Sequence, residues 1–231
     1  LQAKRTQAWD TPFNAVEAIW AFADKGHLAA LTDSAAPTRL SIDGRSIEEL
    51  GSAGLGYVRH TETLTNAPAT LTAEKSSDGT SWGAVYAQYL QPMRETRASS
   101  AGLKVSREIL GDDGKPATQL TVGGRVRVRI TIQADRDYDF VMVNDMRAAC
   151  LEPVAQESGY QWGYYLETRD QSTRYFFHQI AKGKHVVETE YYIDREGNYL
   201  SGTCTAQCAY APEYSGRTTA AIVKVSKPTT Y

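Results

Sequence analysis

Three aspartates, Asp135, Asp137 and Asp139, stand at alternate positions with the spacing that begins a calcium-binding loop. Carboxylates at those positions would supply the oxygen ligands that Ca²⁺ prefers. Such a loop also needs a glycine at its sixth position for a sharp turn and a glutamate at its twelfth to close the site. Phe140 and Met146 occupy these two positions here. The sequence therefore predicts a charged connection between strands rather than a metal site.

Other residues that could do chemistry are scattered along the chain. The four histidines are far apart in the sequence, and none belongs to a serine or cysteine nucleophile motif: His27, His60, His178 and His185. Three loop glycines lack the order and the βαβ context of a dinucleotide fingerprint: Gly51, Gly54 and Gly56. We therefore predict no catalytic residue, no cofactor site, no metal site and no enzymatic activity.

Composition narrows the classes of partner. The chain has 231 residues and a net charge of −2, and it contains 14 tyrosines but only 5 phenylalanines. A nucleic-acid partner would require a basic surface, so none is expected. No apolar run reaches the roughly 18 residues of a membrane-spanning helix.

Leu1 is not an initiator methionine, and the residues after it do not form a signal peptide. We expect an internal start, with any anchor upstream.

The first segment predicts one helix near residues 12–24. Thr11 and Pro12 form a start signal, because a hydroxyl caps the helix and proline fits its first position. The residues that follow are apolar nearly all round, up to Gly26. Such a helix is normally buried on several sides. We expect it to be under-buried in this chain, because no other segment reads as a strong helix that could cover it.

From about residue 37 the pattern changes to that of strands. Residues 39–47 read as a hairpin around Asp43-Gly44, the dipeptide of a primed turn. Residues 57–63 read as a strand. Residues 70–75 and 82–90 read as a second hairpin around residues 77–79, and residues 91–102 as a linker.

The third segment alternates more cleanly. Val126, Val128, Ile130 and Ile132 point one way, while Arg125, Arg127, Arg129 and Thr131 point the other. This is the pattern of a half-buried antiparallel strand, and the arginines predict a solvated face paired with carboxylates. Further strands are expected at 138–143, 163–168, 173–180, 185–193, 199–210 and 218–226. About seven strands separated by turns predict a mainly β fold, an antiparallel β-sandwich with one N-terminal helix.

Three cysteines allow at most one disulfide. Cys204 and Cys208 are four residues apart on one predicted strand, about 13 Å at strand rise, too far to bridge each other. Cys150 could therefore reach only one of the two.

Short motifs follow one another in the last third of the chain. They are Asp145, Ala148, Ala149 and Glu152; Tyr175, Phe176 and Phe177; Gly183–Tyr192; Gly197 and Tyr199; and Tyr210, Pro212 and Glu213. In this order they resemble the C-terminal macroglobulin-like domain of bacterial alpha-2-macroglobulin family proteins over about residues 103–226. The segment Trp9–Phe13 and the helix after it resemble the last helix of that family's α/α-toroid domain.

The resemblance implies a domain layout. Residues 1–31 would be the terminal helix of the toroid, 32–95 a CUB-like β segment and 96–231 the terminal macroglobulin-like sandwich. It also implies a large protease-trapping parent in the periplasm or at the cell surface, membrane-anchored through its N-terminal part. The partners would then be the upstream domains of the parent and, through the full-length protein, proteases.

The same resemblance bears on the cysteines. The family forms a thioester between Cys and a Gln three residues on, in a Cys-x-Glu-Gln context. In Cys204-Thr-Ala-Gln207 an alanine replaces the glutamate, so we interpret this stretch as an ordinary strand. For the disulfide, Cys150–Cys208 is preferred, because Cys208 adjoins the Tyr210-Ala-Pro212 corner, which in the family lies near the turn that follows Asp145.

A surface adhesion or glycan-binding sandwich is the alternative function. Exposed Trp or Tyr side chains would act as sugar platforms in such a module. An aromatic ladder on one sheet face would favour this alternative, and a helix that docks on missing neighbours would favour the fragment of a protease trap.

Overall fold

A computed structural model describes residues 12–25, 38–47, 58–63, 69–76, 81, 83–117 and 119–228. The chain divides into two compact units, Trp9–Gln88 and Tyr89–Tyr231. The described residues form a mainly β structure with antiparallel sheets and one α-helix, which confirms the predicted fold class. No helix in these ranges has the length and apolar character needed to cross a membrane.

The smaller unit contains the predicted helix and the predicted first hairpin. Helix α2 (Pro12–Lys25) begins at the proline. Strands β1 (Arg39–Ile42) and β2 (Arg45–Ile47) pair around Asp43 and Gly44, whose φ angles of 49° and 77° fit a primed turn. The helix is under-buried as expected, with four large apolar side chains exposed: Phe13, Val16, Ile19 and Trp20.

In the rest of this unit the predicted strand at 70–75 is confirmed, but its predicted hairpin partner and the strand predicted at 57–63 are wrong. Strand β3 (Leu71–Glu74) pairs with β1, and the described residues 58–63 and 83–90 contain no strand. Asp43 holds the end of β3 against the hairpin, because its carboxylate accepts the Thr70 amide at 2.8 Å and its own amide donates to the Thr70 carbonyl at 3.0 Å. His27, the three loop glycines and residues 77–79 lie outside the described residues.

The larger unit is a β-sandwich. Its strands are β4 (Ser99–Ala101), β5 (Leu103–Leu110), β6 (Leu120–Thr121), β7 (Arg125–Ala134), β8 (Tyr138–Met146), β9 (Leu151–Pro153), β10 (Gly159–Gln161), β11 (Tyr164–Thr168), β12 (Ser172–Ile180), β13 (Gly183–Ile193), β14 (Gly197–Ser201), β15 (Cys204–Cys208), β16 (Ser215–Arg217) and β17 (Ala221–Ser226). The expected linker 91–102 instead carries the 3-10 turn η1 (Met93–Glu95) and β4.

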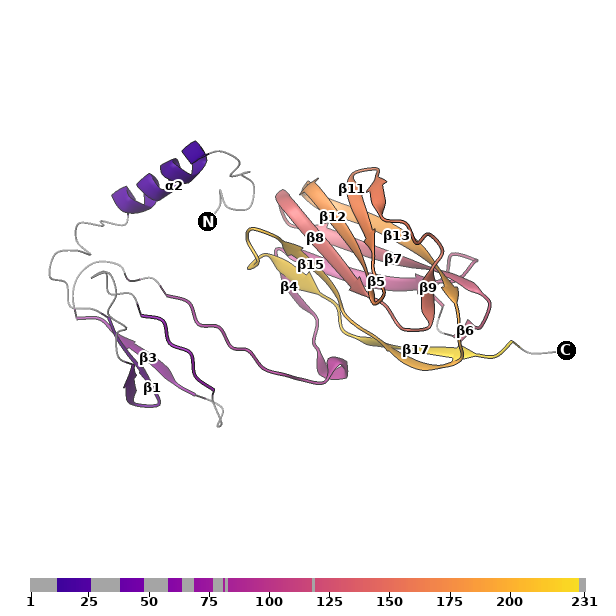
Figure 1. Cartoon of the computed structure of the whole chain (residues 1–231), viewed down its shortest axis with the longest axis horizontal. Helices are drawn as coiled ribbons and strands as arrows, with labels where there is room; N and C mark the ends of the chain where they lie inside the picture. The colour runs from indigo at the N-terminus through magenta and orange to yellow at the C-terminus, as the bar shows by residue number, and fades with distance from the viewer. Residues whose placement is uncertain are drawn as a thin grey trace. The chain divides into compact units, whose positions relative to one another are not determined.

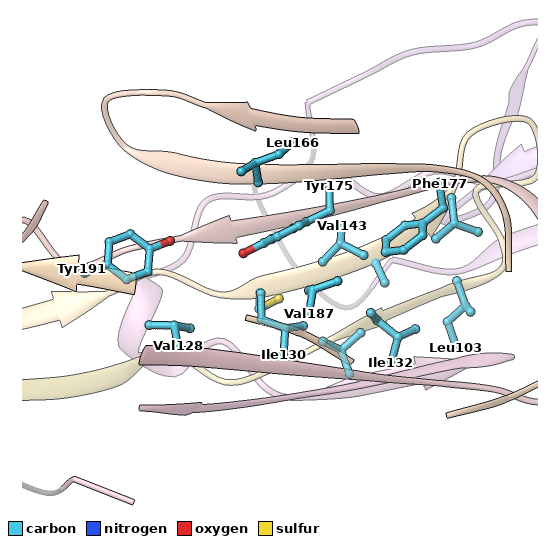
Figure 2. Packing of buried hydrophobic residues seen from close by; sticks show 14 of the residues in the cluster. Leu103, Val128, Ile130, Ile132, Val143, Leu166, Tyr175, Phe177, Val187 and Tyr191 are labelled. Atoms are coloured by element: carbon cyan, nitrogen blue, oxygen red, sulfur yellow. The ribbon is translucent and has the colours of Figure 1, made fainter. Parts of the chain in front are cut away.

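One eleven-stranded sheet supplies both layers of the sandwich (Figure 1). Its order is β10-β11-β12-β8-β15-β16-β4-β5-β7-β13-β9. The inward side chains of β7, Val128, Ile130 and Ile132, point toward Val143 of β8 and Tyr175 of β12 (Figure 2). The predicted alternation of β7 is confirmed, because Val126, Val128, Ile130 and Ile132 are all buried.

A small third sheet closes one end of the sandwich. Its order is β14-β17-β6, with β17 antiparallel to β14 and parallel to β6. The sequence predicted one strand over 199–210, but the chain breaks there into β14 and β15, which belong to different sheets. Gly202 lies between them where an added Cβ would come within 2.3 Å of Met146, so this corner accepts only glycine without a local shift.

Candidate functional site

A buried arginine–carboxylate pair lies inside the sandwich near the end formed by β14. Arg107 of β5 donates from Nη1 to Asp145 Oδ1 at 2.8 Å and to the Met146 carbonyl at 3.1 Å. Its Nη2 donates to Ser201 Oγ at 2.6 Å and to the Gly202 carbonyl at 2.9 Å. The side chains of Arg107 and Asp145 are only 8% and 1% exposed. This arginine therefore ties together β5, β8 and the β14–β15 corner.

The electrostatics of this pair follow from burial. Burial raises the pKa of Asp145, and the positive charge of Arg107 acts in the opposite direction. Burial, together with the negative charge of Asp145, raises the pKa of the Cys204 thiol well above its ordinary value. The reactive form of cysteine is the thiolate. Cys204 is therefore held as an unreactive thiol.

Sequence reasoning identified Asp145 as part of a motif but missed its partner. Residues 103, 105, 107 and 109 share one face of β5, and the first two are buried leucine and valine. An arginine at an inward position of an alternating strand needs a buried acceptor. The position of Arg107 within Leu103–Leu110 was the signal that could have revealed the pair.

The Cys204–Gln207 stretch is part of strand β15. Residues three apart on a strand point to opposite faces. Cys204 is fully buried, while Gln207 is half-buried on the opposite face. The interpretation of this stretch as an ordinary strand is confirmed.

The predicted Cys150–Cys208 disulfide is not formed. Cys150, Cys204 and Cys208 are all buried free thiols. The register of β15 on β8 explains the error. Cys208 lies opposite Val141, in the first half of β8, and Cys204 lies opposite Asp145, near its end. Cys150 follows that end of the strand, so it comes after the residues beside Cys204 and not those beside Cys208. The thiol of Cys208 instead donates to the Asp139 carbonyl at 3.2 Å.

Two tyrosine–threonine hydrogen bonds continue the polar interior. The Tyr191 hydroxyl lies 2.7 Å from Thr173 Oγ1, and the Tyr175 hydroxyl lies 2.6 Å from Thr189 Oγ1. Tyr175, Tyr191 and Thr173 are each 0% exposed. Burial raises the pKa of Tyr191 to about 12 and that of Tyr175 further still. These hydroxyls therefore stay protonated at neutral pH and act as structural hydrogen-bonding groups.

The outer face of β7 and β13 carries the predicted arginine stripe. Glu188 accepts Arg129 Nε at 2.5 Å and lies 3.4 Å from Arg127 Nη1, while Glu190 lies 3.4 Å from Arg127 Nη2. Arg125 sits 4.7 Å from the ring centroid of Tyr192 and hydrogen-bonds its hydroxyl. The prediction of a solvated stripe paired with carboxylates is confirmed.

The aspartate trio forms a strand connection, as predicted. Asp135 accepts hydrogen bonds from Arg136 and from the Tyr138 hydroxyl, and Asp137 accepts the Lys182 amide at 2.7 Å. These carboxylates bind protein groups rather than converge on one point. Within the described ranges, no group of three His, Cys, Asp or Glu side chains could hold a metal ion.

The described histidines take separate structural contacts. His60 Nε2 lies 2.9 Å from Glu62, and His185 Nε2 lies 2.7 Å from the Ala181 carbonyl. His178 stacks on Phe140 with ring centroids 4.8 Å apart. None of these contacts links a histidine to a cysteine or serine, so no nucleophile–base pair is formed among them.

Comparison with known proteins identifies the sandwich. Residues 102–213 match the model of the bacterial alpha-2-macroglobulin MG10 domain. Residues 102–213 therefore form a domain of the bacterial alpha-2-macroglobulin MG10 type. Comparison with curated proteins gave no match.

Solved structures show the same fold at low sequence identity. Trypsin-activated alpha-2-macroglobulin from Escherichia coli matches with a TM-score of 0.55 and 15% identity over 98% of this chain and 16% of its own. An E. coli alpha-2-macroglobulin structure that spans domain MG7 to the C-terminus matches with a TM-score of 0.51 and 16% identity, over 86% of this chain and 34% of its own. Salmonella alpha-2-macroglobulin reacted with methylamine gives 0.52 and 16%, over 84% and 13%. The chain therefore spans only a minor part of each of these proteins.

Proposed function

We propose that this chain is the C-terminal structural and recognition part of an alpha-2-macroglobulin-like protease-trapping protein. The match of residues 102–213 to the MG10 domain carries the proposal. In this role the sandwich packs on upstream domains of its own parent and presents a surface, and it performs no catalysis. The buried, protonated Cys204 thiol supports a non-catalytic role, because it is the cysteine that a thioester reading of Cys204–Gln207 would need.

The proposed domain layout keeps three parts. Residues 1–31 would end an α/α-toroid, 32–95 would form a CUB-like β segment and 96–231 the macroglobulin-like sandwich. Helix α2 supports the first assignment, because its large apolar side chains are exposed in this chain, with Trp20 at 70% exposure and Phe13 at 81%. A contiguous exposed apolar helix face normally meets a partner. For this helix, the neighbouring helices of a toroid would be that partner.

The proposed location follows from the family. A protease trap of this kind would act in the periplasm or at the cell surface, with the parent anchored to the membrane through its N-terminal part. The test is fractionation of cells that express the tagged full-length parent. Recovery of the parent in the cytosolic fraction alone would contradict the location.

The decisive functional assay compares the full-length parent with this chain. Each is mixed with a broad-specificity protease, and cleavage of a large protein substrate and of a small peptide substrate is measured. We expect the parent to suppress cleavage of the large substrate while the small one is still cleaved, because a trapped protease stays active but enclosed.

This chain alone should leave both cleavage rates unchanged, because trapping needs a segment for the protease to cut and an enclosing shell of other domains. A parent truncated before residue 96 is the matched control for the contribution of the sandwich. Protection by this chain alone, or no protection by the full-length parent, would refute the proposal.

A further inference from the structure

An aromatic row crosses the outer face of the sandwich on the strands β10, β11, β12 and β8. The residues Tyr160, Tyr165, Phe176 and Met142 are consecutive register partners across these strands. Their chain neighbours Leu166, Tyr175, Phe177, Val141 and Val143 face the core, so the row faces outward. The rings of Tyr160 and Tyr165 are 5.0 Å apart, and those of Tyr165 and Phe176 are 6.4 Å apart.

The exposed end of the aromatic row lies at the β10–β11 hairpin. Trp162 occupies the turn and is 99% exposed, and Tyr160 is 88% exposed. Gly163 completes the turn with a φ of 90°, a backbone angle that other residues rarely adopt. The hairpin therefore presents two uncovered aromatic rings on a hydrogen-bonded strand pair at the edge of the sheet.

A polar row runs beside the aromatic row, two residues further along each strand. It consists of Glu167, Arg174 and Asn144, which are register partners on β11, β12 and β8. Arg174 donates to Glu167 Oε2 and to Asn144 Oδ1, each at 3.3 Å, and Arg169 also pairs with Glu167. At strand rise the two rows are about 6.8 Å apart.

The exposed apolar area is small for a protein partner. A ring of this kind buries about 150–250 Å² in an interface, so Tyr160 and Trp162 together offer about 300–500 Å². A stable protein–protein interface buries about 800 Å² on each side, polar and apolar atoms together, spread over about 20–30 residues. The other members of the row, Tyr165, Phe176 and Met142, are already half-buried. The face thus suits a smaller ligand.

We propose that this face binds a neutral oligosaccharide. A pyranose ring presents C–H bonds on its flat faces and hydroxyls around its rim. The faces would stack on Trp162 and Tyr160, because the π face of an aromatic ring carries partial negative charge that attracts C–H groups. The rim hydroxyls would bond to planar groups of the polar row, Glu167, Arg174 and Asn144. These are preset by their mutual hydrogen bonds, and so little conformational entropy is lost on binding.

The test uses the whole 231-residue chain and three defined probes, cellohexaose, chitohexaose and laminarihexaose. Binding is followed by calorimetry and by the indole N–H signals of the ¹⁵N-labelled chain, in which the Trp162 signal is assigned by its loss in Trp162→Ala. We expect at least one probe to bind with a dissociation constant on the order of 1 mM or tighter. The Trp162 signal should shift on titration.

Trp162→Ala and Tyr160→Ala should each weaken binding by about tenfold or more, and Arg174→Met by about threefold to tenfold. Tyr192→Ala is the matched control, since Tyr192 is 41% exposed on the opposite outer face, and it should leave binding unchanged. Circular dichroism checks that each variant is folded.

Four outcomes would overturn the proposal: no binding of any probe up to about 10 mM, unchanged binding in Trp162→Ala, an equal loss in Tyr192→Ala, or self-association of the chain that Trp162→Ala abolishes. The last result would assign the face to a protein contact.

Discussion

Two sets of arginine–carboxylate pairs in the sandwich differ in where they lie and in how they are bonded. Arg107 and Asp145 are buried between the layers, and Arg107 bonds to Asp145, to Ser201 and to two backbone carbonyls. Arg127, Arg129, Glu188 and Glu190 form a stripe on the outer face, with side chains 31–50% exposed. The chemistry of the two sets is the same, but the surrounding dielectric is not.

The difference shows what each set can do for the fold. In water, attraction between exposed charges is weak and screened by salt, so the outer stripe contributes mainly to solubility and strand pairing. Inside the protein, loss of one partner leaves an uncompensated charge, which is strongly destabilising. The buried pair therefore fixes the positions of β5, β8 and β14 relative to one another, whereas the outer stripe only accompanies a register that β7 and β13 already share.

Removal of the buried arginine should give the largest effect. In Arg107→Met the Asp145 carboxyl and the Ser201 hydroxyl lose the hydrogen bonds from Arg107 inside the core, and the free energy of unfolding should fall by about 3–5 kcal/mol. Urea denaturation measures the loss. Arg129→Met is the matched control on the outer stripe and should cost less than about 1 kcal/mol. Equal losses in the two variants would show that burial does not decide the weight of these pairs.

A double replacement tests whether the loss comes from the charge. In Arg107→Met with Asp145→Leu neither buried charge remains, so the double variant should recover about 1–3 kcal/mol relative to Arg107→Met alone. Recovery should be incomplete, because Ser201 and the Met146 and Gly202 carbonyls still lack the hydrogen bond from Arg107, although Ser201 keeps its bonds to Ala221. Urea denaturation of both variants under the same conditions provides the measurement. No recovery would indicate that packing around Arg107, and not the charge of Asp145, causes the loss.

The sequence predicted the outer stripe but not the buried pair, and the reason is physical. Alternation of Val126, Val128, Ile130 and Ile132 with arginines depends on residues of one strand, and the structure confirms it. The Arg107–Asp145 pair joins residues 38 apart along the chain, so it depends on which strands meet. The wrong prediction of a Cys150–Cys208 disulfide has the same origin. The pairing of β15 with β8 places Cys204, and not Cys208, at the end of β8 that Cys150 follows. The pairing of β3 with β1 was likewise non-local.

Adjacent tyrosines of β13 extend the comparison to alkaline pH. Tyr191 points inward and its pKa is raised to about 12, while Tyr192 is exposed. In the unfolded chain a tyrosine loses its proton near pH 10. Between about pH 10 and 12 the unfolded state therefore binds fewer protons, and stability should fall as pH rises, by about 2–3 kcal/mol from Tyr191 alone.

Tyr191→Phe should flatten this alkaline decline, although it costs about 1–3 kcal/mol at neutral pH because the Thr173 hydroxyl loses its buried partner. Tyr192→Phe is the control: it loses only a solvent-exposed hydrogen bond to Arg125 and should cost no more than about 1 kcal/mol at neutral pH, while the decline from Tyr191 should remain. Urea denaturation at pH 8, 10 and 11 distinguishes the variants. An unchanged decline in Tyr191→Phe would assign the alkaline sensitivity to other buried groups, with Tyr175 the first candidate because burial raises its pKa further.

The smallest effect is expected on the outer stripe. Glu188 is paired with both Arg127 and Arg129, so Glu188→Gln removes the central charge while the side chain keeps its size. The free energy of unfolding should fall by less than about 1 kcal/mol at low salt. In about 1 M NaCl the Debye length falls to about 3 Å, and the difference from the unmodified chain should disappear. Denaturation at both salt concentrations, with Arg107→Met measured alongside, provides the test.

The loss in Arg107→Met should persist in salt, because ions cannot enter the core to screen Asp145. A salt-resistant loss above 1 kcal/mol in Glu188→Gln would mean that the stripe, although exposed, carries part of the cohesion that we assign to the buried pair.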